Sequence, residues 1–290
     1  MWRVGLLALL LLLSLRALAV ESLTWALMPI PGAINVRDDQ PQDGIIFELL
    51  QQLDAQLSDV AVQYQIINAP RILHYMARGR NLCSAPYQRS PERDQIGYFV
   101  PLLLSQPIQV VVRATDAQRL PLINGQLWLD ELLASDLRGG FFMQRVYPPK
   151  LQARLSEGLQ QKQLIGVNEA TNSDRLLLML GHSRFDYTFE FPISVVGFAR
   201  ANPQAAPLRT VPLADLEQMP VFGSYCTRNA WGREMAARID NAVRALLADP
   251  QQVQALYQRW LPVESYQTYQ PEIQEFLRQR AQQSLSFPAP

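Results

Sequence analysis

The sequence of 290 residues contains little lysine, histidine or cysteine, and these shortages exclude several classes of site. Lysine occurs only at Lys150 and Lys162, so arginine carries nearly all of the positive charge. The 26 basic residues are balanced by 26 acidic ones, which leaves no basic surplus of the kind that binds nucleic acid. The sequence also lacks a glycine-rich phosphate loop, a His/Cys metal-ligand spacing and a heptad repeat. We therefore expect no nucleic-acid partner, no metal and no cofactor.

The two histidines, His74 and His182, have no partner at metal-ligand spacing, and we interpret both as structural or surface residues. A catalytic site would need an acid–base pair that faces one pocket. Glu190 is the one acidic candidate that the sequence offers, and a single carboxylate does not make a mechanism. We therefore expect no catalytic residues and no enzymatic activity.

The first residues of the chain have the pattern of a signal peptide. A short basic start is followed by an apolar run from Val4 to Leu15 and by a small-x-small motif that ends at Ala19. These features predict a leader at residues 1–19 that is cleaved after Ala19. Arg16 interrupts the apolar run, which is shorter than the ~20 residues that a membrane span requires. We therefore expect the mature chain in the periplasm, without a membrane span.

Helix and strand patterns alternate along the mature chain. Apolar residues recur with helical spacing at residues 45–57 and again at residues 71–78. Strands at residues 23–28, 60–67 and 82–87 separate them, an order that favours a parallel sheet. A similar series follows Arg113, with strands at residues 139–144, 164–168 and 185–191 and helices at 127–133, 148–155 and 173–180. Two such units, each of roughly a hundred residues, indicate two lobes.

The four residues from Ser90 to Arg93 combine several helix-start signals directly after a predicted strand. Ser90 is a preferred N-cap, because its hydroxyl oxygen accepts a backbone N–H of the first turn. Pro91 fits the first helical position, and Glu92 complements the positive end of the helix. The guanidinium of Arg93 is then held near backbone N–H groups and a hydroxyl. Such a group can bind a carboxylate through two parallel hydrogen bonds.

This order of elements resembles the type II periplasmic solute-binding proteins, in particular their polar-amino-acid branch, extracellular solute-binding protein family 3. In that family a strand is followed by Ser or Thr, two residues, Arg, an aromatic segment with a proline, and a hydrophobic strand that leads into the hinge. The matching residues here are Ser90, Arg93, the segment 98–102 and the buried strand 108–113. The resemblance covers the chain from about Leu23 to Pro262.

The resemblance implies an α/β protein with the two-lobed type II fold, in which each lobe is a mostly parallel sheet flanked by helices. It places lobe 1 at residues 20–113 and 217–264, and lobe 2 at residues 114–216. By resemblance, a strand at residues 221–226 returns to lobe 1. Residues 265–290 form a C-terminal helix and tail, which we expect to be peripheral and partly mobile.

In this fold the ligand lies in the cleft between the lobes, outside the carboxyl ends of the strands. The resemblance assigns the ligand carboxylate to Ser90 and Arg93 in lobe 1. Trp25 and Tyr87 stand at strand ends of the same lobe and are candidates for stacking on the ligand. Aromatic residues at strand ends are also common in protein cores, so that alternative stays open.

Lobe 2 offers Arg145, Tyr147 and Glu190 as ligand-binding candidates, together with residues 168–172 at another strand end. Arg145 and Tyr147 occupy a helix entry where the family usually has Gly and Thr or Ser. Three interpretations of Arg145 stay open. It binds a second anionic group of the ligand, it forms a salt bridge to lobe 1 when the lobes close, or it lies on the surface of lobe 2. Glu190 lies near the family's acidic residue for the ligand ammonium, one residue short of the usual spacing. We interpret Asp186, earlier in the same strand, as a buried structural carboxylate.

The only two cysteines are Cys83 and Cys226. Cys83 begins the third predicted strand of lobe 1, and the resemblance places the strand that ends at Cys226 antiparallel beside it. Because exported proteins meet an oxidising compartment, we expect one disulfide, with two buried thiols as the alternative.

The predicted function is capture of a small polar, carboxylate-bearing, amino-acid-like ligand by a monomeric periplasmic protein, for uptake by an ABC-type permease. One alternative is a ligand-sensing or regulatory module without transport, whose partner is a sensor protein. The other is a dehydratase-like enzyme on the same fold. The near absence of lysine and the position of the histidines away from strand ends argue against the enzyme.

Overall fold

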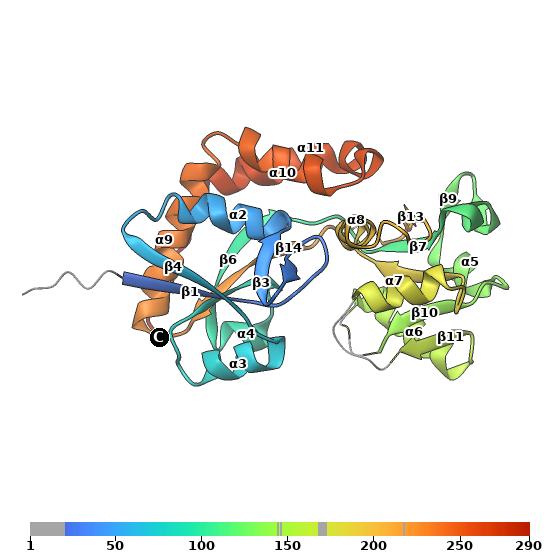
Figure 1. The fold of residues 1–290 in the computed structure, drawn as a ribbon, viewed down its shortest axis with the longest axis horizontal. Coiled ribbons are helices and arrows are strands. Elements are labelled where there is room, and N and C mark those ends of the chain that lie inside the picture. Colours follow the sequence, from blue (N-terminus) through green and yellow to red (C-terminus); the bar gives the residue numbers. More distant parts are fainter. Residues whose placement is uncertain (1–20, 144, 146, 168–172, 217) are drawn as a thin grey trace, which may run out of the picture.

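The computed structural model describes residues 21–143, 145, 147–167, 173–216 and 218–290. Figure 1 shows two lobes side by side, each with a sheet at its centre and helices around it. Within the described residues, every helix is too short or too polar to cross a membrane. The predicted signal peptide at residues 1–19 lies outside them.

The sheet of lobe 1 has five strands, of which one runs against the others. In sheet order they are β4 (Val60–Ile66), β1 (Glu21–Leu27), β5 (Cys83–Gln88), β14 (Val221–Thr227) and β6 (Gly97–Leu104). β1 pairs in parallel with β4 and β5, whereas β14 pairs antiparallel with β5 and β6. Four strands therefore point the same way and β14 points back, so the sheet is mostly parallel, as predicted.

The sheet of lobe 2 repeats this topology. In sheet order it contains β11 (Leu164–Val167), β10 (Gly139–Phe142), β12 (Tyr187–Glu190), β7 (Gln109–Arg113) and β13 (Leu208–Val211). β10 pairs in parallel with β11 and β12, whereas β7 pairs antiparallel with β12 and β13. In both sheets the reversed strand is the one that enters from the other lobe. The repeated arrangement confirms the two-lobed α/β fold.

The chain crosses between the lobes twice, from β6 to β7 and from β13 to β14. The two linkers touch, because the backbone N–H of Ser105 donates to the carbonyl of Pro220 over 2.9 Å. The structure places β7 in lobe 2, so lobe 1 ends before this strand rather than at Arg113 as we expected. A buried apolar run predicts a central strand but does not say which sheet it joins, since its pairing partners are distant in sequence.

Strand β1 shows how the core of lobe 1 is divided between the two faces of its sheet. Leu23, Trp25 and Leu27 belong to the larger cluster, and Ala26 belongs to the smaller one on the other face. The larger cluster includes residues of α2 (Ile45–Asp54), α9 (Ala230–Leu246) and α10 (Gln251–Trp260), and the smaller one includes residues of α3 (Ala69–Ala77). Each fully buried aliphatic or aromatic side chain of this kind stabilises the fold by about 1.5–3 kcal/mol.

Helices on both faces of the second sheet enclose two smaller cores. One face is covered by α5 (Leu129–Ala134) and α6 (Pro149–Gln160), and the other by α7 (Ser173–Gly181) and α8 (Pro192–Ala201). The predicted helices of lobe 2 correspond to α5, α6 and α7, whereas α8 was not predicted. Its sequence contains two adjacent valines and a glycine, which are weak helix formers, so tertiary packing rather than propensity stabilises it.

Two short hairpins were also not predicted. The first joins β2 (Asn35–Arg37) to β3 (Gln40–Asp43), and the second joins β8 (Leu122–Ile123) to β9 (Gln126–Leu127), after the 3-10 helix η1 (Ala114–Arg119). Asp38 and Asp39 turn the first hairpin with positive φ angles, and Asn124 and Gly125 do so in the second. Asp, Asn and Gly tolerate this left-handed conformation best, which explains their presence at the turns.

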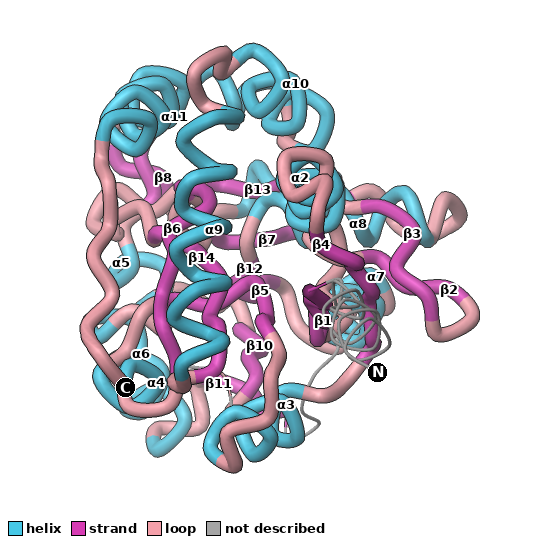
Figure 2. The backbone as a smooth tube through the Cα atoms, turned by 90° about the vertical axis from the view of Figure 1, so that its left-hand side faces the viewer, coloured by secondary structure: helices cyan, strands magenta, loops and turns pink. Residues whose placement is uncertain are grey.

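The C-terminal segment is an integral part of lobe 1 rather than the peripheral tail that we expected. Figure 2 shows the final residues running beside α9, after α11 (Val263–Gln282). Arg280 is 1% exposed and its guanidinium contacts the carboxylate of Asp240 on α9. The second oxygen of the same carboxylate accepts the backbone N–H of Leu285 over 3.1 Å. One buried acid thus fixes both the last helix and the tail.

Cys83 of β5 and Cys226 of β14 form a disulfide, which confirms the predicted bond. The two residues are register partners in neighbouring antiparallel strands, and both are fully buried. Their sequence separation is 143 residues, so the bond links the two separate stretches of chain that build lobe 1.

Replacing both cysteines with alanine is expected to lower the free energy of unfolding by about 2–4 kcal/mol, because a disulfide restricts the unfolded chain. Denaturant titrations of the oxidised parent and of the variant measure the difference. A thiol titration of the denatured, unreduced parent is expected to find no free thiol. An unchanged unfolding midpoint in the variant would contradict this prediction.

Candidate functional site

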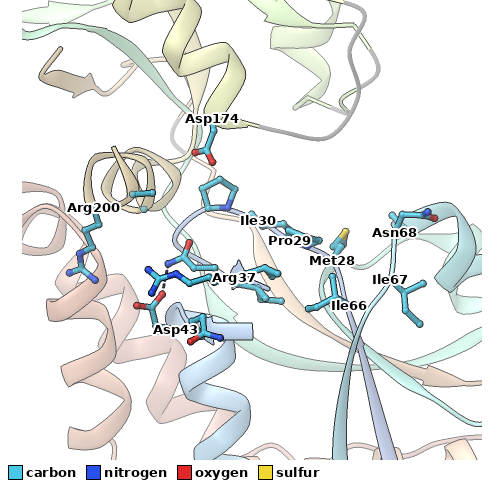
Figure 3. Close-up of a pocket in the computed structure, with 18 residues that line it drawn as sticks. Met28, Pro29, Ile30, Arg37, Asp43, Ile66, Ile67, Asn68, Asp174 and Arg200 are labelled. Atoms are coloured by element: carbon cyan, nitrogen blue, oxygen red, sulfur yellow. Dashed lines mark hydrogen bonds between the residues drawn. The ribbon is translucent and has the colours of Figure 1, made fainter. Parts of the chain in front are cut away.

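A cavity of about 870 Å³ lies between the lobes, a volume in the range of small-molecule sites. Figure 3 shows Asp174 of α7 and Arg200 of α8 on its lobe 2 side, and Met28, Ile67 and Asn68 on its lobe 1 side. The β2–β3 hairpin closes a further side. The cavity therefore has walls from both lobes.

Most of the residues that line the cavity are apolar. Eight of them come from the β1–β2 connection, from β2 and from the carboxyl end of β4, namely Met28, Pro29, Ile30, Pro31, Ile34, Val36, Ile66 and Ile67, and the others include Ala69 and Ala201. The charged lining residues are Arg37, Asp43, Asp174 and Arg200. Asn68 also lines it and caps α3, since its Oδ1 accepts the backbone N–H of Arg71 over 3.0 Å. The lining suits a ligand with an apolar body and a charged group.

The carboxyl end of β5 adjoins this cavity. β1 lies between β4 and β5 and runs parallel to both, so the three strands end at one edge of the sheet. Met28 and Ile67, which line the cavity, pack against the cluster that contains Tyr87. Tyr87 therefore shares a cluster with two residues of the cavity wall, whereas Tyr87, Ser90 and Arg93 themselves are not among the lining residues.

The predicted helix start at Ser90 is present as α4 (Pro91–Asp94). Ser90 Oγ accepts the backbone N–H of Arg93 over 3.3 Å, which is the expected N-cap bond. Arg93 Nη1 donates to the carbonyl of Gln88 over 2.9 Å, and its guanidinium carbon lies 5.1 Å from the centre of the Tyr87 ring. A guanidinium carries five N–H donors, so one bond to Gln88 leaves donors for an anion.

The two aromatic candidates of lobe 1 are both buried. Tyr87 is 4% exposed, and burial raises the pKa of its hydroxyl. Trp25 is completely buried in the core, where its indole Nε1 donates to Asp54 of α2 over 3.0 Å. The structure therefore places Trp25 inside the lobe instead of at the cleft, because its position in β1 turns the ring toward α2.

Arg145 and Glu190, two of the predicted candidates of lobe 2, form an ion pair. Glu190 Oε2 accepts Arg145 Nη2 over 2.8 Å, and Glu190 Oε1 accepts the backbone N–H of Phe191 over 2.9 Å. Burial acts to lower the pKa of Arg145, but the nearby carboxylate of Glu190 outweighs it and raises that pKa. Of the alternatives for Arg145, the structure shows a salt bridge, and its partner Glu190 belongs to the same lobe.

Tyr147, the third candidate of lobe 2, is buried inside the lobe and contacts the last residue of β10. It is 4% exposed, its hydroxyl oxygen accepts the backbone N–H of Phe142 over 3.1 Å, and burial raises its pKa to about 12. Asp186, directly before β12, makes the structural contacts that we expected, but it is partly rather than fully buried. It accepts the backbone N–H of Arg138 over 2.9 Å and lies 3.4 Å from the guanidinium of Arg113.

Sequence analysis missed all four charged residues of the described cavity lining, among them Asp174 and Arg200 of lobe 2. Asp174 lies in the first turn of α7, and its carboxylate points toward the cavity in Figure 3. Burial and then the nearby Glu190 raise the pKa of Asp174. An acid in the first turn of a predicted helix at a strand end is a signal that could have found it. The predicted candidates at residues 168–172 lie outside the described part of the chain.

Helix α8 connects the two lobes beside the cavity. Gly197 lies so close to Gly32 of lobe 1 that a Cβ atom at Gly197 would stand 2.1 Å from the backbone nitrogen of Gly32. Arg200 lies 4.1 Å from the ring centre of Trp260 on α10 and donates to the carbonyl of Arg259 over 2.5 Å. These contacts position the wall that α8 contributes to the cavity.

No protein-family model and no curated protein matches the chain, whereas solved structures do. One is the probable amino-acid ABC transporter extracellular-binding protein YtmK from Bacillus subtilis. It is 17% identical, has a TM-score of 0.65, and the alignment covers 84% of this chain and 99% of that chain.

Two further solved structures have the same arrangement. An ancestral arginine-binding protein bound to glutamine is 14% identical with a TM-score of 0.59, over 82% of this chain and 97% of that chain. A histidine kinase sensor domain with similarity to periplasmic binding proteins is 17% identical with a TM-score of 0.59, over 84% of this chain and 96% of that chain. Identities this low show a shared fold. The chain has the two-lobed fold of the amino-acid-binding proteins of ABC transporters and of related sensor domains.

Proposed function

We propose that the protein is a solute-binding protein that captures a small carboxylate-bearing ligand between its lobes. The observation that carries the proposal is the cavity between the lobes, lined by residues at the carboxyl ends of β1 and β4. Arg93 follows β5, a strand parallel to these two in the same sheet. Ligands of open α/β sheets bind outside the carboxyl ends of the strands. Solved proteins of the same fold are described as amino-acid-binding, which supports the proposal.

The residues have distinct roles in this proposal. Arg93 binds the ligand carboxylate, Ser90 holds the turn that presents it, and Tyr87 backs the guanidinium. The other end of the ligand faces lobe 2, where Arg145 and Glu190 stand. Movement about the two touching linkers closes the lobes on the ligand, as in other hinge proteins. The cleft binds its ligand without changing it chemically.

A thermal-shift screen of the mature chain against amino acids and organic acids tests the proposal. A ligand at a hundredfold its Kd stabilises the folded state by about 2.7 kcal/mol, so a binder raises Tm clearly. Calorimetry is then expected to find one site per chain, and solution scattering a smaller radius of gyration with ligand than without. A complete screen of both classes without a single Tm shift would sink the proposal.

We propose that the captured ligand passes to an ABC-type permease. The likeness to YtmK supports transport, while the likeness to a histidine kinase sensor domain supports sensing as the second candidate. If the role is transport, deletion of the gene abolishes uptake of the radiolabelled ligand. If the role is sensing, uptake persists and the transcriptional response to the ligand is lost.

We also propose that the mature protein is a periplasmic monomer. The leader pattern at residues 1–19 and the disulfide between Cys83 and Cys226 support export to an oxidising compartment. Mass spectrometry of the periplasmic fraction is expected to find Val20 as the first residue. Recovery of the protein with an intact Met1 from the membrane fraction would contradict this location.

A further inference from the structure

The charged residues that line the cavity differ in their exposure to solvent. Arg37, Asp43 and Arg200 are exposed, whereas Asp174 is partly buried. Because water screens an exposed charge, a charged group of the ligand gains more from a contact with Asp174 than from a contact with an exposed side chain. Among the described lining residues, Asp174 is therefore the charge with the greatest influence on which ligand binds.

The protein itself engages two of the exposed charges. Asp43 Oδ1 accepts Asn35 Nδ2 over 2.6 Å, within the β2–β3 hairpin. Arg200 Nη2 donates to the carbonyl of Arg259 on α10 over 2.5 Å. In Figure 3 the carboxylate of Asp174, in contrast, points toward the cavity from the lobe 2 side. A cationic group of the ligand that lies against the lobe 2 wall would meet this carboxylate.

The lobe 1 wall of the cavity is apolar. Met28, Ile30 and Ile67 line it, and all three are only partly buried. Apolar surface that stays accessible in a cavity is covered favourably by the apolar body of a ligand. A polar or charged body on this wall would lose its water without gaining hydrogen bonds, which is costly. The cavity thus combines an apolar wall from one lobe with a carboxylate from the other.

We propose that the ligand is an amino acid with an apolar side chain, whose ammonium group binds Asp174 and whose side chain covers the apolar wall of lobe 1. This inference rests on the proposed function, in which Arg93 binds the carboxylate, and names its ligand class. Asp174 is then the residue that distinguishes an amino acid from an organic acid of the same shape.

Glu190, which the resemblance suggested for the ligand ammonium, is less suited to this role. It is completely buried, and its oxygens accept Arg145 Nη2 over 2.8 Å and the backbone N–H of Phe191 over 2.9 Å. It is also not among the described lining residues, whereas Asp174 is. Burial and the nearby Glu190 raise the pKa of Asp174, and a ligand ammonium would offset this because an opposite charge favours the carboxylate form.

The first test compares probes that differ only in the ammonium group. L-leucine is paired with 4-methylpentanoate and L-phenylalanine with 3-phenylpropanoate, and calorimetry on the mature chain measures each Kd. In at least one pair the amino acid is expected to bind on the order of tenfold or more tightly than the acid. Acids that bind as tightly as their amino acids, or more tightly, in both pairs would overturn the inference and leave the proposed function standing.

The second test compares L-leucine with L-asparagine, which has a similar shape and a polar amide in place of the two methyl groups. L-leucine is expected to bind on the order of tenfold or more tightly, because the amide would lose its water against the apolar wall. L-arginine and L-glutamate, as charged probes, are expected to bind more weakly still. Tighter binding of any of these three than of both L-leucine and L-phenylalanine would overturn the apolar ligand class.

Asp174→Asn tests the named residue directly, because it removes the negative charge and keeps the shape of the side chain. The preference for L-leucine over 4-methylpentanoate is expected to fall by about tenfold in this variant. Asp130→Asn is the matched control, since Asp130 is an exposed acid in the first turn of another lobe 2 helix, α5, and it keeps the parent preference. An unchanged preference in folded Asp174→Asn protein would overturn the role of Asp174.

If Asp174→Asn does not fold, the two comparisons on the parent protein decide. Binding of organic acids without binding of any amino acid would overturn this inference alone. Failure of every amino acid and every organic acid in the screen would remove the proposed function and this inference with it.

Discussion

Replacing Arg93 with alanine is expected to weaken ligand binding by about thirty- to a thousandfold, which corresponds to about 2–4 kcal/mol. The loss is large because the ligand carboxylate would stay desolvated in the cleft without its charged hydrogen-bond partner. Arg93→Lys is expected to recover little, since an ammonium cannot reproduce the two parallel bonds of a guanidinium. Calorimetry with the ligand found by the thermal-shift screen measures the effect, on protein whose fold is checked by circular dichroism.

Arg89 provides the matched control for Arg93. It lies four residues earlier, between β5 and the cap residue Ser90, its side chain is 68% exposed, and it pairs with Asp94 over 2.8 Å. Arg89→Ala is therefore expected to change the Kd less than about threefold, as for other exposed pairs. Parent-like affinity in Arg93→Ala would show that another arginine, such as Arg145 or Arg200, binds the carboxylate.

Replacing Arg280 with alanine is expected to lower the free energy of unfolding by about 3–5 kcal/mol, because it leaves a buried carboxylate without its main partner. Asp240 is 2% exposed, and Arg244 at 3.5 Å is the other cation beside it. Arg280 also donates to the carbonyls of Pro101 over 3.1 Å and Gln283 over 2.8 Å. The substitution therefore loosens α11 and the tail from β6 as well as from α9.

Urea or guanidinium titration followed by circular dichroism measures this loss. Arg278→Ala is the control, since its exposed pair with Glu275 on the same helix is worth at most about 1 kcal/mol. The double variant Asp240→Leu/Arg280→Met is expected to recover much of the stability, because it removes both charges together. Equal losses in Arg280→Ala and Arg278→Ala would mean that the buried pair contributes no more than an exposed one.

Local sequence patterns predicted the elements whose stability is local. The apolar spacing of α2 and of α3 specifies helices without reference to distant residues. Helix α8 and strand β13 were missed because they depend on distant partners, namely Gly32 and β7. The boundary between the lobes differs from the prediction for the same reason, since β12 and β13, the neighbours of β7, lie much later in the sequence.

The candidate site shows the same division. The N-cap at Ser90 depends on only four consecutive residues, and the structure contains it. The burial of Trp25 depends on which face of β1 meets α2, and alternation in a short strand does not fix that choice. The pairing of Arg145 with Glu190 joins the ends of β10 and β12 across 45 residues, so the sequence indicated both residues but not their contact.

The place of β14 in the lobe 1 sheet sets an order for folding during synthesis. β14 lies between β5 and β6, yet it follows the whole of lobe 2 along the chain. Until β14 has been synthesised, β5 and β6 lack the strand that lies between them in the sheet. The disulfide between Cys83 and Cys226 cannot form before then either. Lobe 2 has all five of its strands in one continuous stretch, residues 109–211, and can fold as a unit once that stretch has emerged. The second lobe along the chain is therefore the first to be complete.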